Sequence, residues 1–169
     1  MSLFKYILFA HFLVFSYAIQ AQEIKWMTWE EAAAANEKKP RKIFVDVYTD
    51  WCGWCKRMDA TTFKDPAVVA LMNEKFYAVK LNAEQKESIV WKNEEFKWMS
   101  GGRNGYHTLA YSLLDGKLSF PSFVMLDGNF SRIAISPGYK TGDGFIKELK
   151  YAAEEHYKTT SWEQYFSKS

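Results

Sequence analysis

Cysteine and histidine are both scarce in this sequence. The 169 residues include two cysteines, both in the motif Cys52-Gly53-Trp54-Cys55, and three histidines. A disulfide across so short a loop removes little entropy from the unfolded chain, so it would stabilise the fold only slightly. A soft-metal site needs more ligands than two thiolates, and neither His107 nor His156 stands at metal-ligand spacing from the cysteines. We therefore expect no disulfide-stapled scaffold, no metal and no cofactor.

The sequence also lacks a strong excess of either charge. Its 22 Lys and Arg residues and 20 Asp and Glu residues leave a formal net charge of +2. Nucleic-acid binding needs a concentrated basic surface, whereas the densest basic cluster, residues 38–42, straddles Pro40 in a predicted loop. We therefore expect no nucleic-acid partner.

The apolar run near the N-terminus is too short to span a membrane. Residues 6–15 form this run, well below the ~20 apolar residues that a spanning helix needs. The basic Lys5 precedes it and small residues follow it, which is typical of a secretory signal peptide over residues 1–21, with cleavage after Ala18 or Ala21. An uncleaved anchor is the alternative. We expect a periplasmic or secreted protein with no stable membrane insertion after cleavage.

Residues 22–169 contain no repeat or linker and are predicted to form one domain. Local signals divide its first part into helices and strands. Capping residues and proline mark helix starts, and β-branched and aromatic runs mark buried strands. In chain order, the predicted elements are a helix that begins at the capping box of Thr28 and Glu31, a strand over 43–48, a helix over 53–63, a helix that begins at Asp65-Pro66, and a strand over 76–81.

The second part is predicted to start with a helical insertion over residues 84–119. Gly101-Gly102 separates its two helices, over 84–99 and 107–114. The Asp127-Gly128 turn then joins two strands in a hairpin. The remaining predicted elements are these strands over 122–126 and 132–135, a long helix over 141–157 and a short tail helix capped by Ser161. A strand–helix–strand unit followed by an antiparallel hairpin gives an α/β fold with a central mixed sheet flanked by helices.

The Cys52-Gly53-Trp54-Cys55 motif stands where a predicted strand ends and a helix begins. Free N–H groups and the helix dipole at that point favour a thiolate on Cys52. Cys55 follows one helical turn later, so we expect an exposed nucleophile and a more buried resolving thiol. Cys52 would attack a substrate disulfide, and Cys55 would release the mixed disulfide. A structural disulfide or a pair of metal ligands is the alternative.

Asp46 is the only charged residue in the strand over 43–48. Strand alternation allows its side chain to point beneath the motif, where burial would raise its pKa and let it accept the proton of Cys55. Lys80, on the next strand, is its candidate partner. An exposed position on an edge strand is the alternative. Of the neighbouring tryptophans, we expect Trp51 to be a packing residue and Trp54 to be exposed beside the sulfur.

Residues 44–56, with Asp46 six positions before Cys52, resemble thioredoxin. The resemblance implies the thioredoxin fold, assistance of Cys55 by Asp46, and pairing of Asp46 with Lys80. It also implies that Phe120-Pro121 forms the cis-proline loop, where substrate backbone pairs as an added strand. Pro121 is then a catalytic-site residue, and the expected substrate-contact residues are Gly53, Trp54 and Phe120.

Residues 48–52 and 62–68 resemble the C-terminal periplasmic domain of DsbD-type disulfide reductants. Asp46 and Asp59 stand where that domain carries acidic residues near its cysteines. Two features depart from these families. Trp54 replaces the proline of thioredoxin and the aliphatic residue of the reductant, and the stretch between Leu81 and Pro121 is longer than in thioredoxin.

Together these patterns predict an exported thiol–disulfide oxidoreductase, in the reducing direction. It would reduce or exchange disulfides in exported proteins and draw on an unidentified electron donor. The alternative is a partner-binding module whose aromatic insertion, residues 84–119, captures a partner while the cysteine pair is vestigial.

Overall fold

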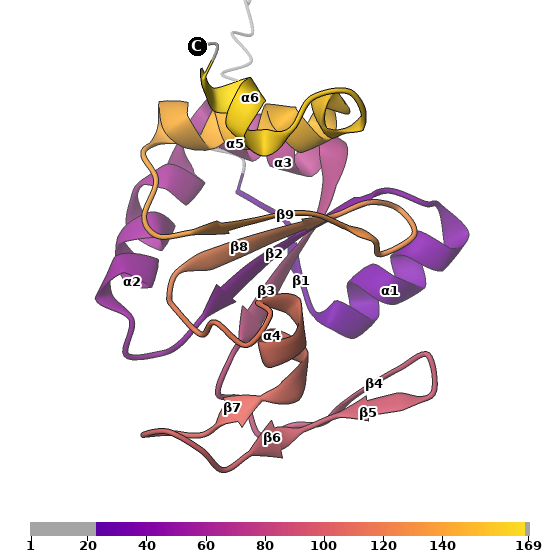
Figure 1. The fold of residues 1–169 in the computed structure, drawn as a ribbon, viewed down its shortest axis with the longest axis vertical. Coiled ribbons are helices and arrows are strands. Elements are labelled where there is room, and N and C mark those ends of the chain that lie inside the picture. Colours follow the sequence, from indigo (N-terminus) through magenta and orange to yellow (C-terminus); the bar gives the residue numbers. More distant parts are fainter. Residues whose placement is uncertain (1–22, 168–169) are drawn as a thin grey trace, which may run out of the picture.

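The computed structural model describes residues 23–167, and its centre is a five-stranded mixed sheet of order β1-β3-β2-β8-β9 (Figure 1). β3 is parallel to both β1 and β2, whereas β8 is antiparallel to β2 and β9 is antiparallel to β8. The mixed sheet predicted from the sequence is therefore confirmed, and the predicted signal peptide lies outside the described residues. The strands are β1 (Trp26–Met27), β2 (Lys42–Tyr48), β3 (Phe76–Asn82), β8 (Ser122–Leu126) and β9 (Arg132–Pro137).

Helices cover both faces of the sheet. Successive side chains of β2 point alternately to the two faces, so they belong to two different cores. Ile43, Val45 and Val47 belong to the core that α1 and α4 complete. Phe44 belongs to the opposite core, beneath the helices α2, α3 and α5. Asp46, two residues after Phe44, therefore faces the α2 side. The helices are α1 (Trp29–Lys38), α2 (Gly53–Ala60), α3 (Pro66–Lys75), α4 (Thr108–Leu113), α5 (Gly142–Ala153) and α6 (Trp162–Ser167).

The predicted helix starts are confirmed by their capping hydrogen bonds. Thr28 and Glu31 form both halves of a capping box. Asp65 caps α3 through its Oδ1, with Pro66 in the first turn. Ser161 Oγ accepts the N–H of Gln164 at 3.3 Å at the start of α6. These caps satisfy N–H groups that a helix cannot satisfy itself, which is why they locate the starts so well.

Two helix ends differ from the sequence prediction. The helix expected over 53–63 ends at Ala60 and continues as a 3-10 turn, η1 (Thr62–Lys64). The helix expected over 141–157 ends at Ala153, and a second 3-10 turn, η2 (His156–Lys158), follows Glu155. Glu155 has a φ of 62°, a left-handed conformation that does not continue an α-helix.

The prediction of a helix over residues 84–99 is wrong. This stretch forms strands β4 (Ile89–Trp91), β5 (Glu94–Phe96) and β6 (Trp98–Met99), and β6 then pairs with β7 (Tyr106–His107). Lys92 and Asn93 both have positive φ, 52° and 63°, and make the two-residue turn between β4 and β5. Ile89 and Phe96 bury their side chains in the α1-side core. This tertiary burial outweighs helix propensity. The predicted helix over 107–114 is confirmed as α4.

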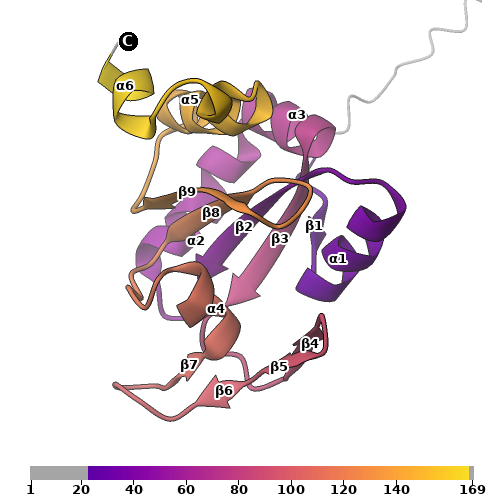
Figure 2. The same cartoon turned by 45° about the vertical axis from the view of Figure 1, so that its right-hand side comes forward.

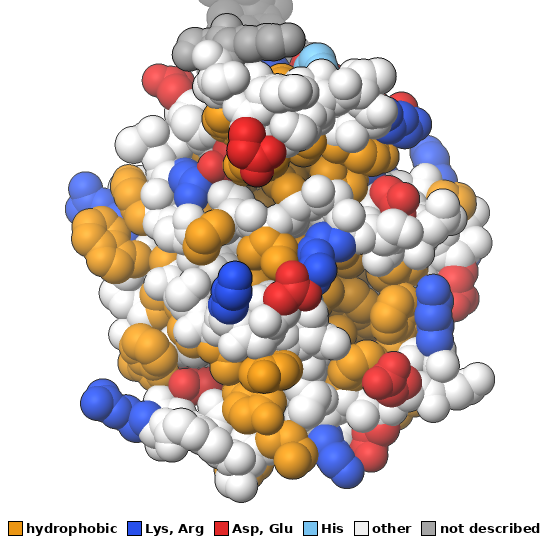
Figure 3. All heavy atoms as spheres, in the orientation of Figure 1, with side chains coloured by type: hydrophobic (Ala, Val, Ile, Leu, Met, Phe, Trp, Pro, Cys, Tyr) orange, Lys and Arg blue, Asp and Glu red, His pale blue; other side chains and the backbone are white. Residues whose placement is uncertain are grey.

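Both hairpins of the insertion lie on the side of the sheet away from α3 and α5 (Figures 1 and 2). Hydrophobic side chains gather at this lower end of the molecule, over α4 and the β6–β7 hairpin (Figure 3). The insertion is thus placed beside two loops: the one that follows β2, which leads into the cysteine motif, and the one that precedes β8.

Within residues 23–167, no helix has the length and apolarity needed to cross a membrane.

Candidate active site around Cys52 and Cys55

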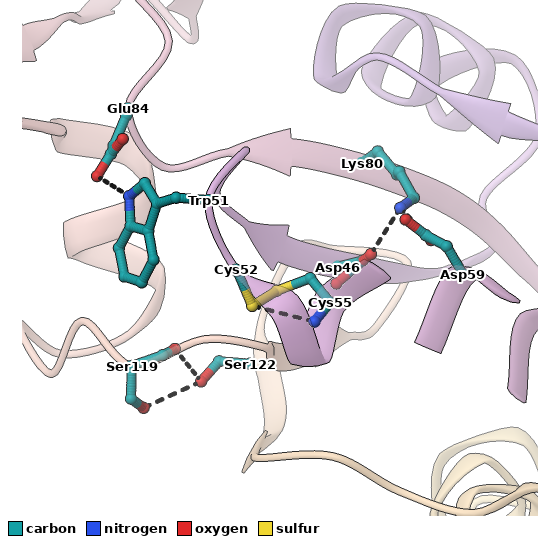
Figure 4. Close-up of a disulfide and its surroundings, with 9 residues drawn as sticks. All are labelled: Asp46, Trp51, Cys52, Cys55, Asp59, Lys80, Glu84, Ser119 and Ser122. Carbon is teal, nitrogen blue, oxygen red and sulfur yellow. Dashed lines mark hydrogen bonds and ion pairs between the residues drawn. A yellow bond between two sulfur atoms is a disulfide. The ribbon is translucent and has the colours of Figure 1, made fainter. Parts of the chain in front are cut away.

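The two cysteines are joined by a disulfide at the first turn of α2. Cys52 is the N-cap of the helix, and its Sγ accepts the N–H of Cys55 at 3.0 Å (Figure 4). The predicted contrast in exposure is wrong for this oxidised form, because Cys52 is 4% exposed and Cys55 is 3% exposed. What distinguishes the two sulfurs is the helix terminus: Cys52 Sγ receives an N–H group that would equally stabilise a thiolate there.

Asp46 lies between the disulfide and Lys80 (Figure 4). Its carboxylate is almost fully buried, and Oδ2 lies 3.2 Å from Lys80 Nζ. This confirms the predicted partner and the predicted burial, since β2 is a central strand and not an edge strand. Burial raises the pKa of Asp46 to about 6, although the charge of Lys80 opposes the shift. Its Oδ1 has no hydrogen-bond partner among the described residues.

Lys80 also contacts Asp59, so two carboxylates share one ammonium group. Burial alone would lower the pKa of Lys80, but the charges of Asp46 and Asp59 outweigh it and raise that pKa. The exposed fraction of the side chain increases along the network: Asp46 is 2% exposed, Lys80 22% and Asp59 44%. The ammonium also lies over the rings of Trp26 and Tyr48, at 5.1 and 4.9 Å from their centroids. This network connects a buried carboxyl beneath the cysteines to solvent.

The loop before β8 faces the cysteine motif. The Phe120–Pro121 peptide bond is cis, as the family resemblance implied. Ser122 Oγ donates to the carbonyl of Ser119 at 2.7 Å, and the carbonyl of Pro121 accepts the N–H of Gly138 at 2.8 Å. Ser119 and Ser122 lie on the side of the disulfide away from Lys80 (Figure 4). The cysteines thus stand between a proton-accepting network and the cis-proline loop.

Trp51, which precedes the motif, and Trp54, which lies within it, are both exposed, at 61% and 62%. Exposure was predicted for Trp54 only, so the prediction that Trp51 is a packing residue is wrong. Its indole N–H donates to Glu84 Oε1 at 2.9 Å, and its ring meets Phe120 edge to face with centroids 6.0 Å apart. Gly53, at the start of α2, is exposed as well.

Trp54 has different neighbours from Trp51. Its ring packs against Tyr139 with centroids 5.3 Å apart. Together with Gly53 and Arg57 these two rings line a hollow of about 530 Å³. Sequence reasoning missed Tyr139 and Glu84, because neither belongs to a motif and both reach the site through tertiary contacts.

Comparison with known families decides where this fold and site belong. Residues 13–120 match the family Thioredox_DsbH, described as "Protein of unknown function, DUF255". The chain belongs to this family. This DsbH-type domain also resembles, at 36% identity over 56 residues, the "Thiol:disulfide interchange protein DsbD" of Vibrio vulnificus. That stretch is 33% of this chain and 9% of the Vibrio protein.

A further relative matches a longer stretch of this chain than the Vibrio protein does. An "Uncharacterized protein B0495.5" of Caenorhabditis elegans is 29% identical over 84 residues, which are 49% of this chain and 12% of that protein. This DsbH-type domain therefore spans a small part of the curated relatives that it matches. The predicted resemblance to DsbD-type proteins is confirmed.

Solved structures confirm the thioredoxin fold. One is entitled "DsbH Oxidoreductase", with a TM-score of 0.57 and 17% identity over 81% of this chain and 89% of that one. A second, a "putative disulphide-isomerase" from Bacteroides thetaiotaomicron, has a TM-score of 0.55 and 23% identity over 80% of this chain and 97% of that one. The chain thus combines a thioredoxin fold with a disulfide between Cys52 and Cys55.

Neither histidine discussed above lies in this site. His107 is fully buried at the start of α4, where its Nδ1 accepts the N–H of Leu109 at 3.3 Å. His156 pairs with Glu154 at 3.0 Å. Across residues 23–167, no group of three or more histidine, cysteine or acidic side chains is placed to hold a metal ion.

Proposed function

We propose that this protein is an exported thiol–disulfide oxidoreductase that reduces or exchanges disulfides in exported proteins through Cys52 and Cys55. The observation that carries the proposal is the position of Cys52 Sγ. It is bonded to Cys55, caps the first turn of α2 by accepting an N–H at 3.0 Å, and stands beside the cis-proline loop. A helix N-terminus stabilises the thiolate that thiol–disulfide exchange requires.

In the reducing direction, the Cys52 thiolate attacks one sulfur of a client disulfide. The client S–S bond breaks, one client thiolate leaves, and a mixed disulfide forms between Cys52 and the client. Cys55, as a thiolate, then attacks Cys52 Sγ and releases the second client thiolate. Two electrons have passed to the client, and the Cys52–Cys55 disulfide of the structure is the product. A dithiol donor must return two electrons to complete the cycle.

Asp46 is the proposed proton acceptor for Cys55. A buried thiol loses its proton reluctantly, and a carboxyl with a pKa of about 6 can take that proton near neutral pH. The free Oδ1 of Asp46 leaves one oxygen available for it. Lys80 holds the other oxygen, and Asp59 holds Lys80 toward solvent. The network gives the proton a route out after the client has left.

The proposed client-contact residues surround Cys52. The backbone beside Pro121 would pair with the client as an added strand, and Phe120, Gly53 and Trp54 would touch the side chains next to its disulfide. The signal-peptide pattern of residues 1–21 supports export. The match to a protein named for thiol–disulfide interchange supports a second thiol protein as electron donor.

The test is catalysed reduction of a protein disulfide with dithiothreitol as the recycling reductant. The wild type should reduce insulin faster than dithiothreitol alone, and Cys52→Ser should lose this gain. Ser112→Ala, an exposed change in α4, is the matched control and should retain it. A wild type without activity, or a Cys52→Ser variant with wild-type activity, contradicts the proposal and favours a binding module with a vestigial cysteine pair.

A further inference from the structure

A cavity of about 700 Å³ lies between the insertion and the residues that precede Cys52 and Pro121. Trp51 and Phe120 form its active-site wall, and they immediately precede Cys52 and the cis-proline Pro121. The insertion supplies the other walls: Tyr111 and Leu118, residues 101–105 of the loop between β6 and β7, and Tyr106 at the start of β7. The cavity is therefore continuous with the surface on which the proposed chemistry takes place.

Glu84 fastens the two walls of the cavity to each other. Its Oε1 accepts the indole N–H of Trp51 at 2.9 Å and the side-chain N–H of Asn104 at 3.1 Å. Trp51 extends from the loop that carries Cys52, whereas Asn104 belongs to the β6–β7 loop. Figure 4 shows Glu84 and the ring of Trp51 on the side of the motif away from Lys80. One carboxylate thus holds Trp51 and Asn104, from the two walls of the cavity, close to each other.

The β6–β7 loop is held close to its neighbours. The N–H of Gly105 donates to the carbonyl of Gly101 at 2.7 Å. A side chain at Gly105 would lie 2.2 Å from Trp98, so only glycine fits. The backbone of this wall is therefore fixed by hydrogen bonding and close packing.

The lining is largely apolar and rich in aromatic rings. Tyr106 and Tyr111 pack with ring centroids 4.9 Å apart, and Trp51 meets Phe120 edge to face. Aromatic rings pair favourably with further rings in tilted and edge-to-face arrangements. A cavity of this volume and lining is of the kind that buries a compact apolar guest, with Leu118 adding an aliphatic surface.

We propose that this cavity receives an aromatic side chain of the client polypeptide, two residues away from the cysteine that Cys52 attacks. The proposal rests on the proposed function and names its substrate class. A client added as a strand beside Pro121 presents every second side chain to the same face, at a rise of ~3.3 Å per residue. The residue two positions from the attacked cysteine thus lies about 7 Å along the strand, on the side of Trp51 and Phe120.

The continuity of the cavity with the cysteine motif favours a polypeptide over a small free ligand. The residues that precede Cys52 and Pro121 line the cavity together with Tyr111, Leu118 and the β6–β7 loop. An occupant of the cavity therefore contacts the active-site loops as well as the insertion. A client chain crossing the disulfide would reach both walls at once. The insertion would then select clients by the sequence next to their disulfide.

The test measures the full-length wild type on two pairs of disulfide peptides and on glutathione disulfide. The two members of each pair differ only in carrying Phe or Ser two residues from the cysteine, on its N-terminal side in one pair and on its C-terminal side in the other. The Phe peptide on one side should show a kcat/KM about tenfold or more above its Ser counterpart, since burial of an aromatic side chain is worth more than ~1.4 kcal/mol. Tyr111→Ala should remove most of this preference and leave glutathione disulfide unchanged.

Ser112→Ala is the matched control, because Ser112 is the next residue of α4, is exposed and does not line the cavity. It should keep the preference. If Tyr111→Ala fails to fold, Leu118→Ala on the same cavity should show the loss instead. Equal kcat/KM for the Phe and Ser peptides of both pairs, or a Tyr111→Ala loss that is equal for all the substrates, overturns the proposal while the proposed function stands. Failure to reduce any of the substrates overturns both.

Discussion

Lys80 Nζ lies 3.2 Å from Oδ2 of Asp46, and the two residues are direct partners in the register of β2 with β3. The register fixes the pair without help from the loops, because both residues belong to central strands of one sheet. The pairing of β2 with β3 therefore places a buried carboxyl beside an ammonium group. The cysteine motif is placed above them by the loop that follows β2.

The first prediction concerns pH and stability. Because burial raises the pKa of Asp46 from its ordinary value to about 6, the folded protein holds this proton more tightly than the unfolded chain does. The resulting stability is complete below about pH 4 and is lost as pH rises through 6. In the oxidised form, Asp46→Asn should therefore increase the free energy of unfolding at pH 8 by up to ~3 kcal/mol, and change it little at pH 4.

Urea unfolding of the oxidised protein at both pH values measures this effect. Glu37→Gln, an exposed change in α1, is the matched control and should be neutral at both. A loss of stability at pH 8 in Asp46→Asn would mean that the pair with Lys80 outweighs the burial of the charge.

The second prediction separates the roles of the two cysteines. They are equally buried in the disulfide form, so the assignment depends on the helix terminus, where Cys52 Sγ accepts the N–H of Cys55. Cys55→Ser should accumulate a mixed disulfide with insulin, visible by intact-mass spectrometry, and Cys52→Ser should not. The variant lacking both cysteines sets the background. Equal trapping by the two single variants would contradict the assigned asymmetry.

The third prediction concerns export. Lys5, the apolar run of residues 6–15 and the small residues after it predict that the mature protein begins at Ile19 or Gln22. Intact-mass analysis of the native protein should show the corresponding loss of mass. Leu13→Asp interrupts the apolar run and should leave full-length protein inside the cell. A wild type that keeps its first residues and remains in the cytoplasm would refute the export prediction.

Local signals predicted the parts of the fold that local interactions determine. Thr28, Asp65 and Ser161 each cap the helix that they were expected to begin, because a cap needs only neighbouring N–H groups. The position of Asp46 followed from strand alternation. The cis bond at Pro121 followed from the family resemblance, since nothing in the residues themselves requires it.

The insertion could not be predicted in the same way. Residues 89–96 form a hairpin because Ile89 and Phe96 find a core beneath α1, a contact that no local pattern encodes. β1 is only two residues long, too short for an alternation to be visible. The exposure of Trp51 likewise depends on Glu84, 33 positions away in the sequence. Sequence reasoning therefore placed Cys52 at the start of a helix and Asp46 beside Lys80, but it missed the equal burial of the two sulfurs and the contacts of Glu84 and Tyr139.

The fourth prediction tests the packing of the β6–β7 loop. A Cβ at Gly105, where φ is +75°, would lie 2.2 Å from Trp98 and 2.6 Å from the carbonyl oxygen of Met99. Gly105→Ala should therefore reduce the free energy of unfolding by on the order of 3 kcal/mol, from strain and overpacking together. Gly102→Ala is the control, because Gly102 also has positive φ but open space around it, and its loss should be about 1 kcal/mol. Equal losses in urea unfolding would show that Trp98 yields to the added methyl group.

The last prediction concerns the direction of electron flow. Negative charge near a thiol opposes thiolate formation, and the carboxylates of Asp46 and Asp59 both lie on the Lys80 side of the disulfide (Figure 4). A less stabilised thiolate makes the reduced form less favourable, so the pair gives up electrons more readily. The reduction potential should therefore lie nearer the thioredoxin value of about −270 mV than the value of about −120 mV of the strong oxidant DsbA.

Removing the buried charge should move that potential in a known direction. Asp46→Asn favours the Cys52 thiolate, so equilibration with glutathione should give a potential that is less negative by on the order of 10 to 30 mV. The same variant should release a mixed disulfide more slowly, because Cys55 loses its proton acceptor. Glu37→Gln should change neither quantity. A wild-type potential close to that of the strong oxidant would reverse the proposed direction, yet the thiolate at the start of α2 and its exchange with client disulfides would still be required, since an oxidant uses the same two sulfurs.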